Sequence, residues 1–466
     1  MVDMKILKGV SANGIPFNVL RNPQFIKMFD AIKKAPSGYK PPSSDKARTV
    51  LLDECVREVE KDLMPVKDTW YTQGVSIVSY GWSNVKRNPL INVLAVNSRG
   101  ATFMYADDFS GVEKTRLEIS KFLLGAIDTI GPSNVLQVVT DNVANCKAAG
   151  REIEKGGSCH NHCLEFMEGV YKKWGRKHPN TWGESSRYYK RRFFWEDVEN
   201  ILAITKPIFS MIKFSDGEGP KMREIYERMD NMLGEIKDAM KENKFSIYYD
   251  EIERIVVTRW DKMTIPLHCL WFALNPRFYD RRYLEKLAPG GILRKAPNED
   301  KEVITNVMEA FERIAENKEE DRVLREQFVT FHMKKGIYAM ASTQADTLTL
   351  DAIDWWSMYG SETPDLAEVA KKVLSQPISS SLAERNWSTH SYIHNVKRNR
   401  LNSKRANKLV FIHSNVCLFY KCGSHKKWDV NPKSTFIEGS SARLEGMAWQ
   451  NLDNELVDNG KGKRPT

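Results

Sequence analysis

Two carboxylates and a phenol stand at places in the chain where a metal-dependent nuclease would carry three carboxylates. Asp141 follows an apolar run typical of a buried strand, Glu384 stands in a predicted helix, and Tyr80 closes an earlier apolar run. Hard cations such as Mg²⁺ bind anionic oxygens, and two of them about 3.5–4 Å apart activate an attacking oxygen and stabilise a leaving one. A phenol has a pKa of about 10 and is neutral at pH 7, so Tyr80 would leave such a site one ligand short.

Each of these residues also has a simpler interpretation. An aspartate directly after a strand often caps a helix, and Glu384 beside Arg385 could be an ordinary exposed pair on a helix. Asp107 and Asp108 could in principle replace the missing carboxylate, but they end a different predicted strand from the one that holds Tyr80. Cleavage of nucleic acid is therefore not expected, and an active nuclease that tolerates Tyr80 is the alternative.

The elements that must position these residues follow from the periodicity of apolar side chains. Three short strands are predicted, over residues 75–79, 90–96 and 102–106. A tight hairpin at Asn97–Gly100 is predicted between the second and the third. An amphipathic helix over 111–130 and a buried strand over 135–140 follow. This β-β-β-α-β order matches the first half of a ribonuclease-H-like sheet, in which the first and fourth strands are neighbours. Tyr80 and Asp141 are therefore expected close together.

The second half of the chain is mostly helical in pattern. An apolar stripe at helical spacing begins near residue 195, and helical patterning continues to about residue 340. The stretch 298–325 is strongly charged, which is typical of a solvated helix face. A further helix is predicted from residue 377 to 396 and carries Glu384.

Composition indicates a globular protein with an anionic partner. The 466 residues include 41% hydrophobic side chains, carry a formal net charge of +10, and suffice for two or three domains. Seven cysteines, an odd number, and the absence of a signal-peptide pattern at Met1 favour a reducing compartment. No window approaches the roughly 18 uninterrupted apolar residues of a membrane span, so no membrane partner is expected.

Two stretches combine cations that suit phosphates with residues that suit base stacking. The segments 171–177 and 187–195 interleave lysine and arginine with aromatic rings, and 397–408 forms a second basic patch that could double as a nuclear-import signal. The simpler alternative is a solvated loop whose rings pack inward. The candidate nucleic-acid contacts in these stretches are Lys172, Lys173, Arg191, Arg192, Arg398 and Arg400.

An ordered set of motifs gives the chain a family resemblance. These motifs are Gly14–Asn18, Gly38–Pro42, Val138–Asn142, Cys159–Leu164, Thr258–Trp260, Leu274–Phe278, Ala383–Ser388 and Lys397–Leu401. Taken in this order, over about residues 10–422, the chain resembles a transposase of the hAT family. The resemblance is to the plant group that carries a domain of unknown function ahead of a C-terminal dimerisation domain.

The resemblance implies roles for individual residues. It implies an Asp, Asp, Glu triad that holds two divalent metals in a ribonuclease-H-like core, with Asp141 and Glu384 as remnants and Tyr80 at the first aspartate. It also assigns Arg259 and Trp260 to an element near the active site, and Cys159 and His162 to a structural motif. Packing is favoured over zinc for that motif because no clean second pair of ligands is present. The N-terminal zinc finger of many family members is not expected, since no cysteine precedes Cys55.

We therefore expect an α/β fold with a ribonuclease-H-like mixed sheet interrupted by a mostly helical insertion. The expected segments are a helical N-terminal segment (1–70), the first part of the core (71–175), the insertion (176–345), a core helix with the dimerisation region (346–425) and a disordered polar tail (426–466). Apolar residues between Leu401 and Tyr420 could complete the core, support self-association, or do both.

The sequence thus predicts a transposase-derived, catalytically inactive nuclear protein. It would act as a homodimer or higher oligomer through its C-terminal region, with DNA as a further partner and no small-molecule substrate. No cofactor is expected, and Mg²⁺ or Mn²⁺ would matter only to an active site. The alternatives are an active DNA transposase and a protein–protein scaffold whose positive charge is incidental.

Overall fold

The computed structural model describes residues 1–83, 87–111, 115–140, 145, 148–150, 153, 167–168, 192–217, 219, 221–241, 245–394 and 401–423. The chain divides into two compact units, Met1–Arg57 and Glu58–Thr466, and each is described by itself. Within the described residues, no helix combines the length and the apolar character needed to cross a membrane.

The N-terminal unit is helical. It contains α1 (Val2–Ala12), the 3₁₀ turn η1 (Phe17–Arg21), α2 (Pro23–Lys33) and α3 (Ser44–Arg48), and it ends within α4 (Val50–Asp62). Helix α2 begins where Pro23 can take the first position, and the Asn22 side chain accepts a hydrogen bond from the Gln24 N–H at 2.9 Å.

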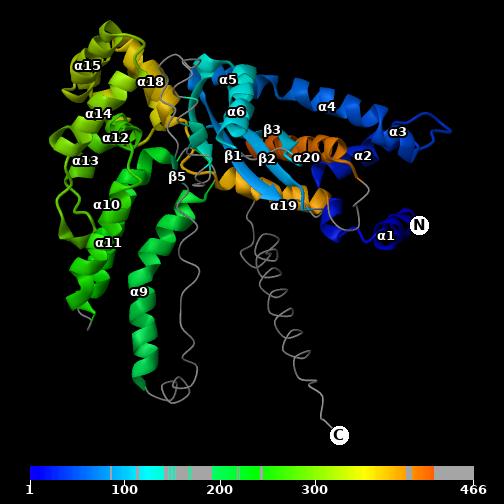
Figure 1. Ribbon diagram of the computed structural model, residues 1–466, viewed down its shortest axis with the longest axis horizontal. Coiled ribbons are helices and arrows are strands. Elements are labelled where there is room, and N and C mark those ends of the chain that lie inside the picture. The colour runs from blue at the N-terminus through cyan, green and yellow to red at the C-terminus, as the bar shows by residue number, and fades with distance from the viewer. Residues whose placement is uncertain are drawn as a thin grey trace. The chain divides into compact units, whose positions relative to one another are not determined.

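A mixed sheet forms the centre of the second unit, after α5 (Met64–Gln73) (Figure 1). Its strands are β1 (Val75–Ser83), β2 (Pro89–Asn97), β3 (Gly100–Asp108), β4 (Val135–Thr140) and β5 (Met167–Glu168), in the order β3-β2-β1-β4-β5. The first three strands pair antiparallel, and β4 pairs parallel with both β1 and β5. The predicted mixed α/β class is confirmed, and so is the hairpin, because Asn97 pairs with Gly100.

The crossover between β3 and β4 is α6 (Arg116–Ile130). The helix begins at Arg116 rather than at Gly111, because the Thr115 hydroxyl accepts a hydrogen bond from the Glu118 N–H and caps it. Its last turn ends at Gly131, whose φ of 97° suits glycine.

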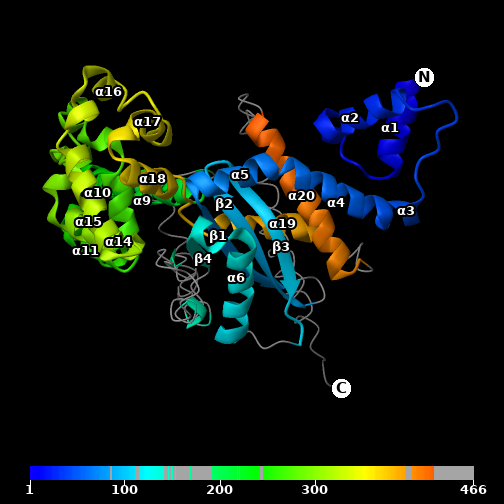
Figure 2. The same cartoon turned by 90° about the horizontal axis from the view of Figure 1, so that it is seen from above.

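The two faces of the sheet are covered by different helices (Figure 2). On one face, α6 packs against strand side chains that include Ile77, Ile91 and Val93. On the other face lie α19 (Ser381–Ile393) and α20 (Ser403–Gly423), which pack against side chains that include Val78 and Leu94. The sheet therefore has a buried core on both sides, and the segment that closes the second side comes from the far end of the chain.

Between β5 and α19 the chain forms a helical bundle. Its helices are α9 (Arg192–Ser215), α10 (Ile225–Met240), α11 (Tyr249–Asp261), α12 (Pro266–Ala273), α13 (Arg281–Leu284), α14 (Lys301–Ile314), α15 (Lys318–His332), α16 (Ala341–Ala345), α17 (Ala352–Tyr359) and α18 (Pro364–Leu374). Trp271, Trp355 and Trp356 lie fully buried in one core that joins residues on both sides of position 345.

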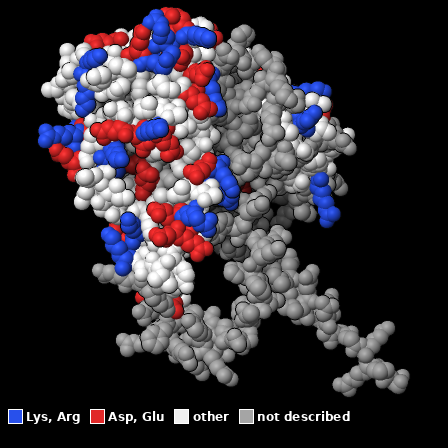
Figure 3. All heavy atoms as spheres, turned by 60° about the vertical axis from the view of Figure 1, so that its left-hand side comes forward, with Lys and Arg blue, Asp and Glu red and all other residues white. Residues whose placement is uncertain are grey.

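Charges on the bundle surface are mixed and paired. Figure 3 shows lysine and arginine interspersed with aspartate and glutamate over this side of the molecule. On α15, Arg322 contacts Glu319 and Glu326, both at 2.5 Å. The predicted charged stretch 298–325 therefore forms two helices, α14 and α15, whose exposed sides carry i,i+3 and i,i+4 ion pairs.

A buried polar network ties the first strand to the segment between α18 and α19. The Ser76 hydroxyl donates to Gln376 Oε1 at 2.6 Å and accepts from Gln137 Nε2 at 2.8 Å. Gln376 Nε2 also donates to the Gln73 carbonyl at 3.1 Å, and Gln137 Nε2 donates to the Pro377 carbonyl at 3.3 Å. Two strands of the sheet are thus joined to the chain that leads into α19.

Candidate functional site

Tyr80 lies near the end of β1, on the face of the sheet that α19 covers. Side chains alternate along a strand, and Val78, Tyr80 and Trp82 all pack with the cluster that includes α19 residues. Tyr80 is partly buried and pairs across the sheet with Asn92 of β2. Its phenol therefore points to the same side of the sheet as the helix that carries Glu384.

Asn92 links Tyr80 to the start of α19. Its Oδ1 accepts a hydrogen bond from the Tyr80 N–H at 2.9 Å, and its Nδ2 donates to the Ala383 carbonyl at 2.9 Å. The side chain is completely buried, so each unmade hydrogen bond would leave a buried polar group unpaired. The Trp387 indole completes the link by donating to the Tyr80 carbonyl at 3.3 Å. Both backbone groups of Tyr80 thus connect, through two side chains, to α19.

Glu384 lies in the first turn of α19, directly after Ala383. Its side chain is exposed, and a carboxylate at this end of a helix is favoured by the partial positive charge of the unpaired N–H groups. The neighbouring Arg385 donates a hydrogen bond to the Asp216 carbonyl. The structure therefore brings the helix that carries Glu384 next to the strand that carries Tyr80.

An aromatic cluster lies beside this link. The Trp82 and Trp387 rings are stacked with centroids 5.2 Å apart, and the His390 ring lies 5.7 Å from the Trp82 ring and 5.3 Å from that of Trp387. The His394 ring follows 6.1 Å from that of His390. Burial, and secondarily the nearby His394, lowers the pKa of His390 to about 4, so this ring is neutral at pH 7.

Sequence reasoning did not single out Asn92 or His390 as site residues. A signal for each was present: Asn92 is the one amide in the otherwise apolar run Leu90–Val96, and His390 follows Trp387 at the i,i+3 spacing of one helix face. A lone polar residue in a buried strand needs a partner, which here is the helix 291 residues further along the chain.

Asp107 and Asp108 do not lie at the position of Tyr80. Tyr80 pairs with Asn92, and Asn92 pairs with Ala106, so all of β2 separates Tyr80 from the end of β3. Two strand spacings amount to about 10 Å. Asp107 follows Ala106 and therefore points to the opposite face of the sheet.

Asp108 points back to the face of Tyr80 but is engaged by its own neighbours. Its carboxylate accepts hydrogen bonds from the Ser110 N–H at 2.9 Å, the Ser403 hydroxyl at 3.1 Å and the Asn88 amide at 3.3 Å. Burial raises the pKa of Asp108, but these hydrogen bonds outweigh it and hold the pKa below its usual value. Asp108 thus serves to join β3 to α20.

Several predicted site residues lie outside the described residues: Asp141, Cys159, His162, Lys172, Lys173, Arg191, Arg398 and Arg400. Arg192 is described only as the first residue of α9. Asp141 directly follows Thr140, the last residue of β4, and β4 pairs parallel with β1 up to Val78 and Val139. The roles of these residues stay predictions.

Arg259 and Trp260 lie in the last turns of α11, in the bundle. The Trp260 ring stacks on that of His268, with centroids 5.6 Å apart, and meets the Tyr226 ring edge-on at 6.0 Å. Arg259 is exposed. The packing of Trp260 is that of a bundle core residue, and a contact of this pair with nucleic acid stays a prediction.

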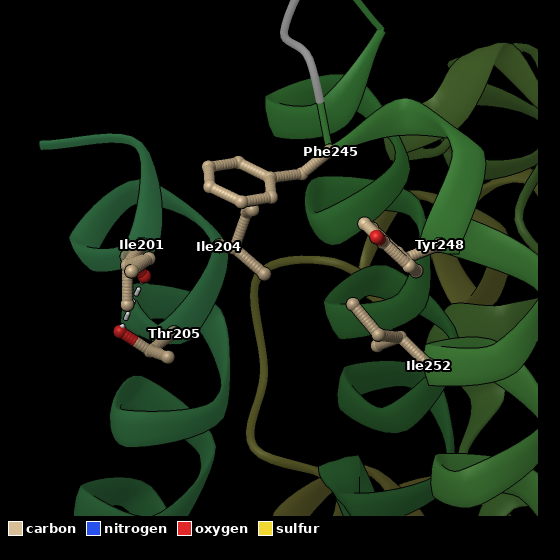
Figure 4. A pocket seen from close by; sticks show the side chains of 6 residues that line it. All are labelled: Ile201, Ile204, Thr205, Phe245, Tyr248 and Ile252. Atoms are coloured by element: carbon tan, nitrogen blue, oxygen red, sulfur yellow. Dashed lines mark hydrogen bonds between the residues drawn. The ribbon is translucent and has the colours of Figure 1, made fainter. Parts of the chain in front are cut away.

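One pocket in the helical bundle is lined mainly by apolar side chains. It has a volume of about 270 Å³ and lies between α9 on one side and the start of α11 with the residues just before it on the other (Figure 4). The lining also includes Thr205, whose hydroxyl donates to the Ile201 carbonyl. The other lining side chains are Ile201, Ile204, Phe245, Tyr248 and Ile252. The pocket thus offers no carboxylate or histidine for catalysis.

The described residues also include no group of three or more histidine, cysteine, aspartate or glutamate side chains placed to hold a metal ion. The predicted metal ligands were Asp141 and Glu384. Because Asp141 is not among the described residues, this pair is not tested as a metal site.

Two family models match the chain. Residues 42–170 match a domain of unknown function (DUF659), and residues 335–416 match the hAT family C-terminal dimerisation region. No curated protein matches the chain. The first match includes β1 to β5 and α6, and the second includes α16 to α19 and most of α20. Both matches lie within the span of the predicted motifs. Gly14–Asn18 and all but the last residue of Gly38–Pro42 precede the first match, and Thr258–Trp260 and Leu274–Phe278 lie between the two matches.

Proposed function

Because the chain is an hAT-family transposase-like protein with the dimerisation region of that family, we propose that it is a transposase-derived nuclear protein that dimerises and does not cleave DNA. DNA is its further partner. No cofactor takes part in this role, and Mg²⁺ or Mn²⁺ would matter only to a restored site.

The sheet supports a ribonuclease-H-like core. Three antiparallel strands are followed by a crossover helix and by β4, which pairs parallel with β1. The Glu384 helix covers the face of the sheet to which Tyr80 points. In this arrangement, residues at the ends of β1 and β4 and on α19 would form one site.

Tyr80 is the observation that carries the proposed inactivity. Two-metal catalysis needs an anionic oxygen that both cations share, and a neutral phenol does not supply it. The Tyr80 N–H donates to Asn92 and the Tyr80 carbonyl accepts from Trp387, so the strand is held in place at Tyr80. Asp107 and Asp108 lie on β3, which β2 separates from the strand of Tyr80. Neither Asp107 nor Asp108 is therefore placed to substitute.

The charge distribution supports contact with DNA outside the bundle surface of Figure 3, where both signs are mixed. The basic stretches 171–177, 187–195 and 397–408 supply cations for phosphates. The last of them is also the proposed nuclear-import signal. A fluorescent fusion that stays outside the nucleus would contradict that assignment.

Nicking of supercoiled plasmid in the presence of Mn²⁺ tests the inactivity directly. The native chain should not nick, whereas Tyr80→Asp should nick if the rest of the site is intact. Tyr80→Asp combined with Asp141→Ala is the matched control and should be silent again. Nicking by the native chain above the level of Asp141→Ala would instead establish an active transposase.

A further inference from the structure

The N-terminal unit buries very little of its own apolar surface. The structure describes all of Met1–Arg57, and only Val10 and Leu52 are buried within that range. Ordering the backbone of a residue costs about 1–2 kcal/mol, and an isolated helix of 11 residues, the length of α2, is marginal in water. Burial of apolar side chains against a partner would therefore stabilise this unit.

Helix α2 presents one continuous apolar face. Its residues Phe25, Met28, Phe29 and Ile32 follow the i, i+3, i+4, i+7 spacing that places side chains on one side of a helix. The Phe25 and Phe29 rings meet edge-on, with centroids 5.1 Å apart. Met28 is 42% exposed and Ile32 is 52% exposed, and the two phenylalanines are only partly buried. The face is thus contiguous along the helix, and the chain itself does not cover it.

Basic residues surround this face. Between Arg21 and Lys34 the chain carries four lysine and arginine residues and one acid, Asp30. Over the whole unit, ten basic residues stand against five acidic ones. At about 100° per residue, Lys27 and Lys34 lie on the side of the helix opposite the apolar face, and Lys33 lies at its edge. A partner that complements this helix combines an apolar contact surface with acidic groups around it.

A groove in another protein fits these features. Helices that dock in such grooves carry apolar anchors at i, i+4 and i+7, as Phe25, Phe29 and Ile32 do. The apolar stripe is about 100° wide, whereas a flat lipid surface would contact a broader side of the helix. DNA phosphates would engage the lysines but leave the apolar face uncovered.

We propose that α2 is a docking helix for an acidic protein that presents an apolar, methionine-lined groove. Phe25, Phe29 and Ile32 are the anchors, and the surrounding lysines meet the acidic rim. Methionine adapts its shape to aromatic and branched side chains, which suits such anchors. This partner is distinct from a second copy of the chain and from DNA, and its binding requires neither of them.

The test titrates the full native chain with calcium-loaded calmodulin as the probe, by isothermal titration calorimetry. Calmodulin is an acidic protein whose methionine-rich groove opens when calcium binds. The native chain should bind with a dissociation constant of about 1 μM or lower, and binding should disappear when EGTA removes the calcium.

Two glutamate substitutions on the same helix form a matched pair. Ile32→Glu places a carboxylate in the apolar face, against an acidic partner, and should raise the dissociation constant about 30-fold or more. Ile26→Glu is the control, because Ile26 is 47% exposed but points about 100° away from Phe25 around the helix. It should change the dissociation constant less than about threefold. Far-UV circular dichroism of both variants should match the native chain.

Three results would overturn the proposal. The native chain might bind no calcium-loaded calmodulin, or Ile26→Glu could weaken binding as much as Ile32→Glu. Binding to vesicles of phosphatidylserine and phosphatidylcholine, lost in Ile32→Glu and without binding to calmodulin, would instead assign the face to a membrane surface. Self-association of both variants, measured by sedimentation velocity, should equal that of the native chain, so the proposed dimerisation is judged separately.

Discussion

A tyrosine at position 80 changes the charge of its site without loosening the strand around it. Its backbone N–H and C=O are both engaged, by Asn92 and by Trp387. A shift of β1 by one residue would break these bonds and turn every side chain to the other face. Substitution of Tyr80 therefore alters one side chain while the strand keeps its place, which makes the aspartate variant informative.

At this scale the sequence could locate Tyr80 and Glu384 on their elements but not the contacts between them. An apolar run and a helical pattern are local features, so both residues were placed on the right kind of element. Asn92 bonds partners 12 and 291 residues away, and no local pattern shows which of these an amide will meet. The position of Asp141 is not described.

The lowered pKa of His390 predicts that the free energy of unfolding falls in mild acid. Its pKa is about 4 in the folded chain, mainly because of burial, and about 6.5 when unfolded. The unfolded state therefore binds a proton first as the pH falls below about 6.5, and the folded state is destabilised until about pH 4. At pH 5 this amounts to about 2 kcal/mol. Urea unfolding midpoints measured at pH 7 and pH 5 should show the loss.

The matched variants for this prediction are His390→Gln and His332→Gln. His390→Gln should reduce the difference in stability between pH 7 and pH 5 by most of the amount that His390 contributes. His332 is only partly buried and its pKa is also lowered, so its substitution should reduce the difference less. An unchanged pH dependence in His390→Gln would contradict the assignment.

At the scale of elements, α20 acts as a substitute for a missing neighbour strand. In the described sheet β3 is an edge strand, and such an edge exposes unpaired N–H and C=O groups. Asn415 Oδ1 accepts from the Phe103 N–H, and its Nδ2 donates to the Phe103 carbonyl, both at 2.9 Å. Asn407, two turns earlier on the helix, donates to the Ala106 carbonyl. The helix thus covers the edge and satisfies part of its hydrogen bonding.

Asn415→Leu should therefore destabilise the chain and expose the edge of β3. Two buried backbone groups would lose their partners, which costs about 2–4 kcal/mol. Urea unfolding measures the destabilisation, and light scattering after mild heating measures edge-to-edge aggregation. Lys404→Ala on the exposed side of the same helix should change neither. A leucine variant as stable as the native chain would show that the amide is dispensable.

The predicted elements show what patterns can and cannot decide. Strand periods and the Asn97–Gly100 turn sufficed for the hairpin, because both depend on neighbouring residues. The run Leu401–Tyr420 was apolar enough for a core, an interface or both, and the contacts of Val410 and Leu418 show that part of it serves the core. Both residues are buried within their own chain. Buried packing leaves no local mark in the sequence that distinguishes it from association.

At the scale of the whole molecule, the proposed DNA binding depends on positive charge and the proposed dimerisation depends on apolar contact. The chain carries a net charge of +10, whereas the core of a protein–protein interface is typically depleted of charged residues. Contacts with phosphates release counterions and weaken steeply with salt, but apolar contacts are not screened. The proposed DNA binding and the proposed dimerisation should therefore respond differently to ionic strength.

Between 50 and 200 mM NaCl, binding to a labelled duplex should fall about 10³-fold if about six phosphates are contacted. Fluorescence anisotropy measures this binding. The dimer dissociation constant, from sedimentation of the same samples, should stay nearly constant. A dimer that weakens in parallel with DNA binding would indicate that charges hold the two copies together.

The pairing of Phe103 with Asn415 has a consequence for synthesis on the ribosome. The two residues are 312 positions apart, and at about 5–20 residues per second their synthesis is separated by about 15–60 s. During that interval the nascent sheet has strands but no helix over one apolar face or over the β3 edge. The amino-terminal half should therefore need a chaperone until the last described helix emerges.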